Sequence, residues 1–362
     1  MELIRKKNVN GSKVLCIAGV DIPYRIETDG DKKRFIAGPL SIPYYRDPET
    51  ESVYLRLAGC RVYLKQNRKA RHYRMRDTLT LEKCRKILEK ELRPLLGYKP
   101  DLRNPRSFNE KINWFKLNYH NPLITECCDK YAVKGYVART VGAEYTLPVL
   151  GVWKDPAAID FDALPQSFVL KVNWSSGFNI IVRDKALLDR QETLRKLERW
   201  IQPASNSYYD TFNWGYKAMQ PVIFAEPYIE QMDGQLHDYK FFMCSGRCEY
   251  MFIAADRYNG TGMTQDFFTR DFEHLPFDYS RSRHADPLPE KPKNYEKMIA
   301  LAEKLSAPFP FVRVDFYEVD DRVLLGEMTF YPGGGTLRFS PVEWDFKLGE
   351  KIALVREMRS SP

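Results

Sequence analysis

The sequence contains few of the residues that build common metal and redox sites. It has only five histidines, none in a spacing such as His-Glu-x-x-His, which argues against a zinc hydrolase. Its seven cysteines are odd in number and include no Cys-x-x-Cys pair, a pattern that predicts reduced thiols in a cytoplasmic protein. The candidate residues for a functional site are therefore lysines, arginines and carboxylates.

Long hydrophobic runs are also missing. No segment approaches the roughly 18 consecutive apolar residues of a membrane span. The apolar run at 14–20 stops at Asp21 without a small-residue cleavage site. Because 44% of the 362 residues are hydrophobic, the chain can build the core of two or three cooperating subdomains. The sequence thus predicts a folded cytoplasmic protein with neither a transmembrane helix nor a signal peptide.

The excess of positive charge is confined to the N-terminal part of the chain. Residues 1–77 hold 17 basic and 9 acidic residues, whereas the remainder holds 39 of each. The densest cluster consists of Arg68, Lys69, Arg71, Arg74 and Arg76. An anionic membrane surface or an acidic glycan would suit this charge, and nucleic acid is not the expected partner. A solvated basic linker explains the same pattern equally well.

The local pattern changes from strand to helix early in the chain. Residues 1–77 form short alternating segments separated by Gly, Pro or Asp turns, which predicts a small β-rich module. From Thr80 the apolar residues recur every three or four positions until Pro94, as in an amphipathic helix. A second helix is predicted to begin at Ser107, whose side chain can form a capping box with Glu110.

The remainder of the chain alternates between helices and strands. Further helices are predicted at 129–140, 186–201 and 294–306. Strands are predicted at 167–174, 221–230, 238–244, 247–255, 311–318 and 323–330. Such alternation indicates mixed sheets that are partly covered by helices.

Two carboxylates are predicted to face each other on a hairpin near the end of the chain. If the hairpin is symmetric about Asp321, Asp315 lies opposite Glu327, and directly opposed Cβ atoms are roughly 4.5 to 5.5 Å apart. Carboxylates this close repel each other unless a cation lies between them, and Mg²⁺ with a phosphate suits hard oxygen ligands. The pattern predicts an Mg-ATP site. Surface ion pairs with neighbouring arginines are the alternative.

The same symmetric pairing predicts the partners and the faces of the neighbouring side chains. Arg313 lies opposite Thr329 on the face that carries the two carboxylates, whereas Leu324 is predicted on the other, apolar face. Gly333, Gly334 and Gly335 follow the hairpin. These glycines could let the backbone approach a bound substrate closely, and a flexible connection is an equally good interpretation.

Two other segments have the composition of a nucleotide site. In one strand, Lys171 points away from the core face, and a Gly/Ser turn follows at 175–177. Backbone amides and an ammonium group in this arrangement suit phosphate oxygens. Residues 226–229 could present backbone groups to an adenine ring, with Asp238 near the ribose and Lys240 near the phosphates. All of these could equally be ordinary sheet positions.

The order of the motifs resembles the ATP-grasp superfamily. The motifs are Asp129-Lys130, FVLK at 168–171 followed by SSG, FAEPYI at 224–229, DYKFF at 238–242, and RVDF with GEMTF in the hairpin. Segments such as PRSFNEKINWFK, CCDKYAVKGYVA and LPQSFVLKVNWSSGFN are similar to the TupA-like branch, which is associated with teichuronopeptide and other surface-polysaccharide biosynthesis. The resemblance covers about residues 79–345 and implies an α+β fold in which two α/β lobes sandwich ATP.

The resemblance also implies a domain organisation. The basic β-rich module at 1–77 lies outside it. A helical segment at 78–125 leads into the ATP-grasp domain, whose first lobe, with the phosphate-binding loop, covers 126–222. The second lobe, with the adenine hinge and the metal site, covers 223–362.

Candidate site residues follow from the matching motifs. The residues implied to bind the nucleotide are Lys130, Lys171, Ser176, Gly177, Glu226, Tyr228, Ile229, Asp238 and Lys240. Asp315 and Glu327 match metal ligands. Arg313 would stabilise the activated carboxylate, while Lys171 positions the phosphates. The family commonly has an Asn as third metal ligand where this chain has Thr329, so a hydroxyl group or a water would complete the coordination.

The activity implied by the resemblance is carboxylate activation by Mg-ATP followed by amide formation. The γ-phosphate would be transferred to a substrate carboxylate, and an amine would then displace phosphate, so that ADP rather than AMP is released. In a polysaccharide pathway, the carboxylate and the amine could belong to a sugar and an amino acid in either order.

Three other functions are compatible with parts of the pattern. A sugar or small-molecule kinase would need the same Mg-ATP site but no amine. A glycosyltransferase would use an Asp-x-Asp metal motif, for which Asp29-Gly-Asp31 and Asp160-Phe-Asp162 are the candidates. A binding protein for an acidic polymer or nucleic acid would use the N-terminal charge and be sensitive to salt, but it leaves the carboxylate hairpin unexplained.

Overall fold

The computed structural model divides the chain into two compact units, Met1–Thr78 and Leu79–Pro362. The structure describes side chains at 79–174, 177–203, 205–206, 208, 211–229, 237–255, 263–278 and 283–355. It describes the backbone also at 204, 209–210 and 279, and in the strands before residue 79.

The first unit consists of antiparallel strands, as its alternating pattern predicts. One sheet has the order β1-β2-β3 and the other the order β4-β5-β6-β7-β8. The strands are β1 (Ile4–Val9), β2 (Ser12–Ile17), β3 (Val20–Pro23), β4 (Arg25–Asp29), β5 (Lys32–Ala37), β6 (Leu40–Arg46), β7 (Val53–Leu57) and β8 (Cys60–Lys65). The basic cluster at 68–76 lies outside the described residues.

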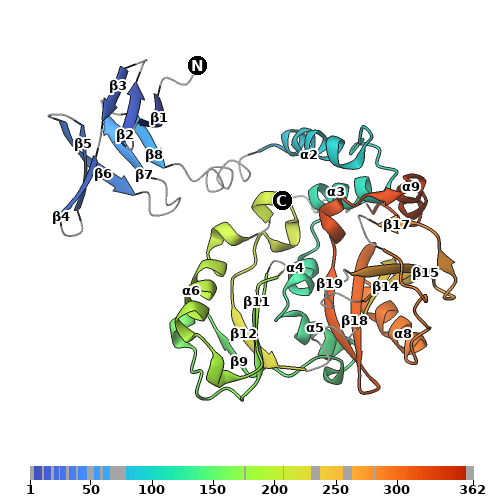
Figure 1. The fold of residues 1–362 in the computed structure, drawn as a ribbon. Coiled ribbons are helices and arrows are strands. Elements are labelled where there is room, and N and C mark those ends of the chain that lie inside the picture. The colour runs from blue at the N-terminus through green and yellow to red at the C-terminus, as the bar shows by residue number, and fades with distance from the viewer. Residues whose placement is uncertain are drawn as a thin grey trace, which may run out of the picture. The chain divides into compact units, whose positions relative to one another are not determined.

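Two helices open the second unit (Figure 1). Helix α2 (Leu81–Leu96) runs two residues past Pro94, which removes one backbone hydrogen bond near the helix end. Helix α3 (Phe108–Asn118) begins with the predicted capping box. The Glu110 N–H donates to Ser107 Oγ at 3.1 Å, and the Ser107 N–H donates to the Glu110 carboxylate at 3.0 Å.

One part of the second unit is built on a four-stranded antiparallel sheet of order β11-β10-β12-β9. Its strands are β9 (Gly151–Trp153), β10 (Phe168–Val172), β11 (Asn179–Val182) and β12 (Ile223–Pro227). The helices of this part are α4 (Pro122–Cys128), α5 (Val133–Thr140), α6 (Arg190–Trp200) and α7 (Tyr208–Thr211).

The helix predicted from residue 129 begins only at Val133. The carboxylate of Asp129 accepts the backbone N–H groups of Tyr131 and Ala132 at 2.8 and 2.9 Å. A short polar side chain that bonds its own backbone favours a turn over a helix. The turn at 129–132 therefore replaces the first part of the predicted helix.

The other part of the second unit is built on a six-stranded antiparallel sheet of order β16-β15-β14-β13-β18-β19. Its strands are β13 (Asp238–Cys244), β14 (Arg247–Ala255), β15 (Thr264–Thr269), β16 (His274–Leu275), β18 (Phe311–Val319) and β19 (Arg322–Thr329). Helix α8 (Tyr295–Ser306) packs on this sheet, and α9 (Glu343–Glu350) packs against α3. Strand β17 (Asp278–Tyr279) pairs with β20 (Phe339–Ser340).

The two faces of the six-stranded sheet differ in character. Successive side chains of a strand point to opposite faces. Phe241 contacts Tyr295 of α8, so this face belongs to the apolar core. Lys240, the preceding residue of β13, points to the other face, where it is paired in register with Asp315. The polar candidates therefore lie on the face turned away from α8.

The β18–β19 hairpin has the predicted pairing at its polar end. Asp315 is opposite Glu327 and Arg313 is opposite Thr329. The hairpin closes at Asp320 and Asp321, which have φ values of +49° and +60°. Positive φ at both central residues is the signature of the two-residue hairpin turn.

The prediction for Leu324 is wrong, because a bulge shifts the register between Asp315 and Phe316. Leu324 is paired with Tyr317 and lies on the face of the carboxylates. The extra residue of the bulge is Gly326, which strict alternation could not reveal.

The glycine cluster after the hairpin packs against a helix. Gly333, Gly334 and Gly335 lie in the 3₁₀ segment η7 (Pro332–Gly335) with φ between +55° and +65°. The Asn113 side chain of α3 donates to the carbonyl oxygen of Gly335 at 2.8 Å, and Lys116 donates to that of Gly334 at 2.7 Å. The close backbone approach that glycine permits is thus made to α3.

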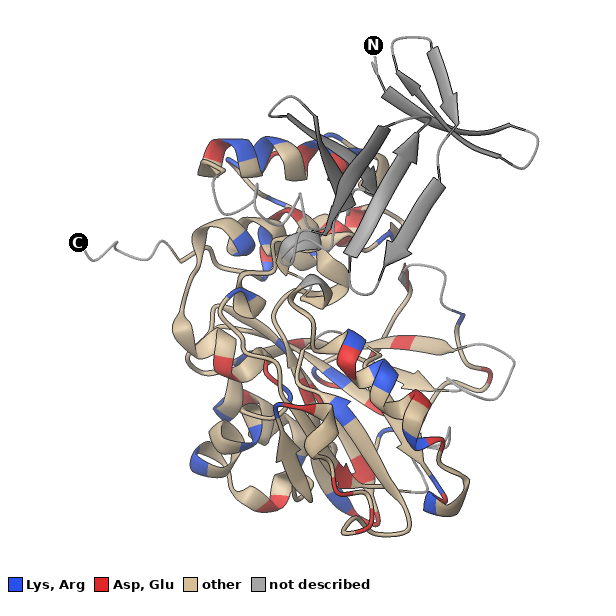
Figure 2. Cartoon of the chain, turned by 90° about the vertical axis from the view of Figure 1, so that its left-hand side faces the viewer, with Lys and Arg blue, Asp and Glu red and all other residues tan. Residues whose placement is uncertain are grey.

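Charged residues of both signs are interspersed over the helices of the second unit (Figure 2). This distribution agrees with the equal numbers of basic and acidic residues after residue 77. Among the described residues, no helix combines the length and the apolar character needed to cross a bilayer.

Candidate nucleotide and metal site

A cavity of about 380 Å³ lies between the four-stranded sheet, helix α5 and the six-stranded sheet. Its polar wall consists of Lys130, Lys134, Lys171, Glu226, Lys240, Gln265, Arg313 and Glu327. Its apolar wall includes Val133, Leu147, Phe178, Phe224, Phe252, Met263, Leu324 and Leu325. A wall that combines apolar side chains with a cluster of cationic groups suits a ligand with a flat ring and a polyanionic tail.

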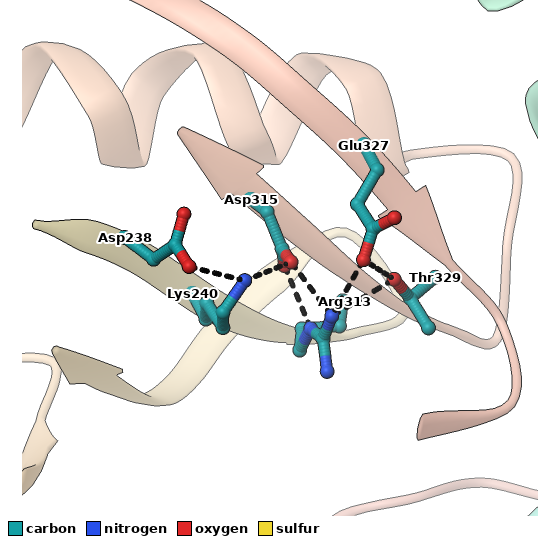
Figure 3. Close-up of polar contacts among 6 residues, drawn as sticks. All are labelled: Asp238, Lys240, Arg313, Asp315, Glu327 and Thr329. Carbon is teal, nitrogen blue, oxygen red and sulfur yellow. Dashed lines mark hydrogen bonds and ion pairs between the residues drawn. The ribbon is translucent and has the colours of Figure 1, made fainter. Parts of the chain in front are cut away.

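The carboxylate hairpin supplies one side of the cavity, and Figure 3 shows the polar contacts of its side chains. Arg313 donates to both oxygens of Asp315, from Nε at 2.7 Å and from Nη2 at 2.6 Å. The same Nη2 donates to Glu327 Oε1 at 3.0 Å and to Thr329 Oγ1 at 3.0 Å. Thr329 Oγ1 in turn donates to Glu327 Oε1 at 3.0 Å. One guanidinium group therefore holds both opposed carboxylates.

A second cation reaches the same carboxylate from the neighbouring strand. Lys240 Nζ of β13 lies 2.5 Å from Asp315 Oδ2 and 3.5 Å from Asp238 Oδ2 (Figure 3). Asp315 is only 1% exposed, and burying a carboxylate beside two cations costs less free energy than burying it alone. Asp238 is also buried, at the start of β13.

Glu327 reaches into the cavity, where its side chain is 42% exposed. Loss of water around the Glu327 carboxyl group would raise its pKa, but the charges of Arg313, Lys240 and Lys130 lower the pKa to about 2. Glu327 is therefore ionised at neutral pH.

The donor set on the hairpin fits Mg²⁺. Among the described residues, the hydrogen bonds and ion pairs of Glu327 are made through Oε1, which leaves Oε2 for a metal. Asp315 accepts three hydrogen bonds, and a carboxylate has about four acceptor positions. Both residues offer the hard oxygens that Mg²⁺ prefers.

The opposite wall of the cavity carries a buried ion-pair network. Lys171 of β10 lies 2.5 Å from Glu226 Oε2 of β12, and Lys134 of α5 forms an ion pair with Glu226 Oε1. Lys134 also donates to the carbonyl oxygen of Leu147 at 2.7 Å. Burial opposes ionisation of Glu226, but Lys171 and Lys134 lower its pKa below the ordinary value. Burial lowers the pKa of Lys134, and Glu226 counteracts this.

Hydrogen bonds made by Asn173 hold the backbone at Lys130, which lines the cavity. Its backbone N–H donates to the carbonyl oxygen of Asn173 at 3.0 Å. The Asn173 side chain donates to Asp129 Oδ2 at 2.6 Å and to the Gln220 carbonyl oxygen at 2.9 Å, and it accepts from the Val222 N–H at 2.9 Å. Burial lowers the pKa of Lys130, and the nearby Glu327 raises it again.

Several predicted residues converge on the cavity and others do not line it. Those that line it are Lys130, Lys171, Gly177, Glu226, Lys240, Arg313 and Glu327. Gly177 has φ +77°, the conformation that makes a glycine necessary in this turn. Tyr228 and Ile229 follow β12 and are half-buried, but they are not among the lining residues. Ser176 lies outside the described residues.

Sequence reasoning missed two residues that belong to this arrangement. Lys134 is the second residue of α5 and lines the cavity together with Lys130, which lies in the turn before the helix. Asn173 is completely buried and connects three separate segments. Its role has no local signal, because its partners are distant in sequence.

The Asp-x-Asp candidate at 160–162 has another role. Asp160 accepts the Asp162 N–H at 3.0 Å, and Asp162 Oδ1 forms an ion pair with Arg190 at 2.5 Å. Neither aspartate lines the cavity. The candidate at 29–31 lies in the first unit, where side chains are not described.

The fold of the second unit is the ATP-grasp fold. A model of the TupA-like ATP-grasp family matches residues 110–353, and the chain belongs to this family. The comparison with curated protein sequences gave no significant match.

Several solved structures are similar to this chain at low sequence identity. D-Alanine–D-alanine ligase from Bacillus anthracis is 16% identical, with 61% of this chain and 64% of that chain covered and a TM-score of 0.37. The Helicobacter pylori enzyme of the same name is 18% identical, with 63% and 61% covered and a TM-score of 0.35. D-Cycloserine synthetase DcsG is 16% identical, with 64% and 72% covered and a TM-score of 0.35. The chain thus spans less than two thirds of the length of the two D-alanine ligases.

Proposed function

We propose that this chain is an Mg-ATP-dependent carboxylate–amine ligase, which forms an amide through an acyl phosphate and releases ADP. The observation that carries the proposal is the convergence of cationic and carboxylate groups on one cavity. These groups are Lys130, Lys134, Lys171, Lys240, Arg313, Glu226 and Glu327. Membership of the ATP-grasp family supports the same conclusion.

The residues have distinct roles in this proposal. Lys130 and Lys171 hold phosphate oxygens as point charges, together with backbone amides of the turn at Ser176 and Gly177. The segment Glu226 to Ile229, including Tyr228, borders the adenine. Asp238 would lie near the ribose and Lys240 near the phosphates.

The chemistry requires charge neutralisation and no covalent nucleophile from the protein. Mg²⁺ bound by Asp315 and Glu327, with Thr329 or water completing the coordination, would neutralise the phosphate oxygens. A substrate carboxylate oxygen attacks the γ-phosphorus, and the bond to the bridging oxygen breaks, so that ADP leaves. An amine nitrogen then adds to the acyl carbon and loses a proton as phosphate departs. Arg313, which lines the cavity, would stabilise the oxyanion of this addition.

The substrate class follows from the resemblance to surface-polysaccharide enzymes. We propose that a uronic acid and an amino acid supply the carboxylate and the amine in a cytoplasmic precursor of a polysaccharide. The basic module at 1–77 would then hold an acidic glycan or an anionic membrane surface.

Calorimetric titration with ATP, with and without Mg²⁺, tests the nucleotide site without knowledge of the substrate. We expect Mg-dependent binding that is at least about tenfold weaker in Lys171→Ala and in Glu327→Gln, since each change removes a charged ligand. Asp315→Asn should behave in the same way. Lys154→Ala is the control, because Lys154 is exposed and does not line the cavity. Absence of ATP binding in the wild type, with binding of a nucleotide sugar instead, would favour a glycosyltransferase.

Product analysis separates a ligase from a kinase. Thr329 replaces the expected third metal ligand and is engaged by Arg313, which keeps phosphate transfer without amide formation as the second candidate. A ligase releases ADP only when a carboxylate and an amine are both supplied. ADP release with a carboxylate or sugar alone, and a stable phosphorylated product, would identify a kinase.

A further inference from the structure

We propose that Asp266, His274 and His284 form a binding site for a divalent cation of the zinc class. One potential ligand atom from each residue lies within 4.8 Å of the others. The site would be additional to the Mg-ATP site of the proposed function.

The three residues come from separate segments that meet at the edge of the six-stranded sheet. Asp266 belongs to β15, His274 begins β16, and His284 follows β17 in the chain. Phe268 is paired with His274, and Asp266 lies two residues before Phe268, so both ligands share one face of the sheet. Gln265, the neighbour of Asp266, lines the nucleotide cavity on the opposite face. The cluster and the cavity are therefore distinct sites.

Two of the three separations between ligand atoms are close to those of a tetrahedral zinc site, and the third is no more than 4.8 Å. His284 Nδ1 lies 2.8 Å from Asp266 Oδ1, and His274 Nε2 lies 3.8 Å from the same oxygen. Zinc bonds of about 2.0–2.1 Å to nitrogen and oxygen place tetrahedral ligand atoms about 3.3 Å apart. Side-chain shifts of about half an ångström would therefore bring both pairs to the required separation.

Asp278 and the backbone of Ala285 contact these side chains in the way that residues around a metal site orient its ligands. The second ring nitrogen of His284, Nε2, lies 3.2 Å from Asp278 Oδ1. An imidazole that binds a metal through one nitrogen typically donates its other N–H to a carboxylate. The Ala285 N–H donates to Asp266 Oδ2 at 3.1 Å, which leaves Oδ1 directed at both histidines.

Electrostatics favour a cation between these groups. Asp266 is completely buried, and within the described part of the chain its ion pairs are made with the two histidines. An ionised carboxylate without a counter-charge is costly to bury. His274 and His284 are 29% and 37% exposed, so an ion and a water ligand can reach the site from solvent. Two imidazoles and one carboxylate select zinc-class ions over Mg²⁺.

Metal titration tests the site directly. Purified full-length protein is stripped with a chelator and titrated with Zn²⁺, and in parallel with Co²⁺, whose visible absorption reports tetrahedral nitrogen and oxygen ligands. We expect one Zn²⁺ per chain at this site, micromolar or tighter, with loss of the Co²⁺ band in His274→Ala and in His284→Ala. Asp278→Asn should weaken binding by about tenfold, because it removes the partner that orients His284.

Two control variants separate this site from others. Glu327→Gln removes a ligand of the proposed Mg²⁺ site, and His120→Gln removes an imidazole that stacks on Trp214 instead. Both should keep the Co²⁺ band. Zn²⁺ should raise the melting temperature of the wild type and of both controls, but not of the two alanine variants. Absence of Zn²⁺ binding in the wild type, or equal binding in the alanine variants, would show an Asp–His ion pair only and overturn the proposal.

Discussion

Glu327 lies directly opposite Asp315 across the β18–β19 hairpin, and one guanidinium group donates to both carboxylates. Without this cation, two opposed carboxylates on a β-sheet would repel each other. The arrangement places a cation beside both carboxylates and keeps the pKa of Glu327 low before any metal arrives. It also leaves Glu327 Oε2 facing the cavity, so that metal binding requires no loss of a proton.

Removal of Arg313 should destabilise the protein. Arg313→Met leaves the buried Asp315 with Lys240 as its remaining cationic partner, and breaking a buried pair costs about 3 kcal/mol. Arg322→Met is the control, since Arg322 is exposed at the turn of the same hairpin and should change the free energy of unfolding by less than about 0.5 kcal/mol. Urea denaturation of the full chain measures both. A loss below about 1 kcal/mol in Arg313→Met would mean that the pair behaves as a surface ion pair.

The low pKa of Glu327 predicts the sign of a pH effect. The folded-state pKa is about 2 and the ordinary value is 4.5, so the folded state binds the proton less readily than the unfolded chain. The ionised carboxylate therefore stabilises the fold fully above pH 4.5, and this stabilisation is lost as the pH falls toward 2. The difference in stability between wild type and Glu327→Gln should be constant at neutral pH and shrink in that window. A difference that does not change with pH would contradict the shift.

Two adjacent glycines provide a matched test of packing in η7. Gly334 and Gly335 have φ values of +63° and +65°, so alanine at either position is strained by about 1–2 kcal/mol. A Cβ at Gly334 would meet no atom within 4 Å, whereas at Gly335 it would lie 2.3 Å from the Asn113 side-chain nitrogen. Gly335→Ala should therefore cost about 1–3 kcal/mol more than Gly334→Ala in urea denaturation. Equal costs would show that η7 moves away from α3 easily.

Asn173 should affect nucleotide binding although it is not a lining residue. Asn173→Ala removes three hydrogen bonds and leaves the Asp129 carboxylate and two backbone groups without this partner. We expect a loss of at least about 2 kcal/mol in stability. ATP affinity measured by calorimetry should fall as well, because the hydrogen bond from the Asn173 side chain to Asp129, the residue before Lys130, is lost. Asn104→Ala, at an exposed position, is the control for both measurements. Unchanged ATP affinity in a destabilised Asn173→Ala would restrict this residue to a structural role.

Much of the fold could be predicted from local pattern. The bounds of β13 and β14 agree with those expected from strand alternation, and the Ser107–Glu110 capping box forms as its four-residue spacing predicts. These features depend on neighbours along the chain, whose geometry is set by the backbone period. The pairing of Asp315 with Glu327 forms as predicted from symmetry about Asp321, but the two-residue turn at 320–321 alone would pair Asp315 with Gly326, and the bulge at Gly326 moves the partner to Glu327.

Other features were decided by contacts between distant segments. The bulge at Gly326 turned Leu324 toward the cavity, and the glycine cluster packed on α3 rather than on a substrate. The sequence alone gave no metal-ligand spacing for the histidines, yet the sheet edge brings His274 and His284 to one carboxylate.

The sequence by itself determined the family motifs and the strands that carry them, because each depends on residues a few positions apart. Only the tertiary structure decided that Lys134 of α5 shares Glu226 with Lys171, and that Asn173 supports Lys130. The physical reason is that these contacts depend on how helices and sheets pack, and packing joins side chains whose separation along the chain follows no period.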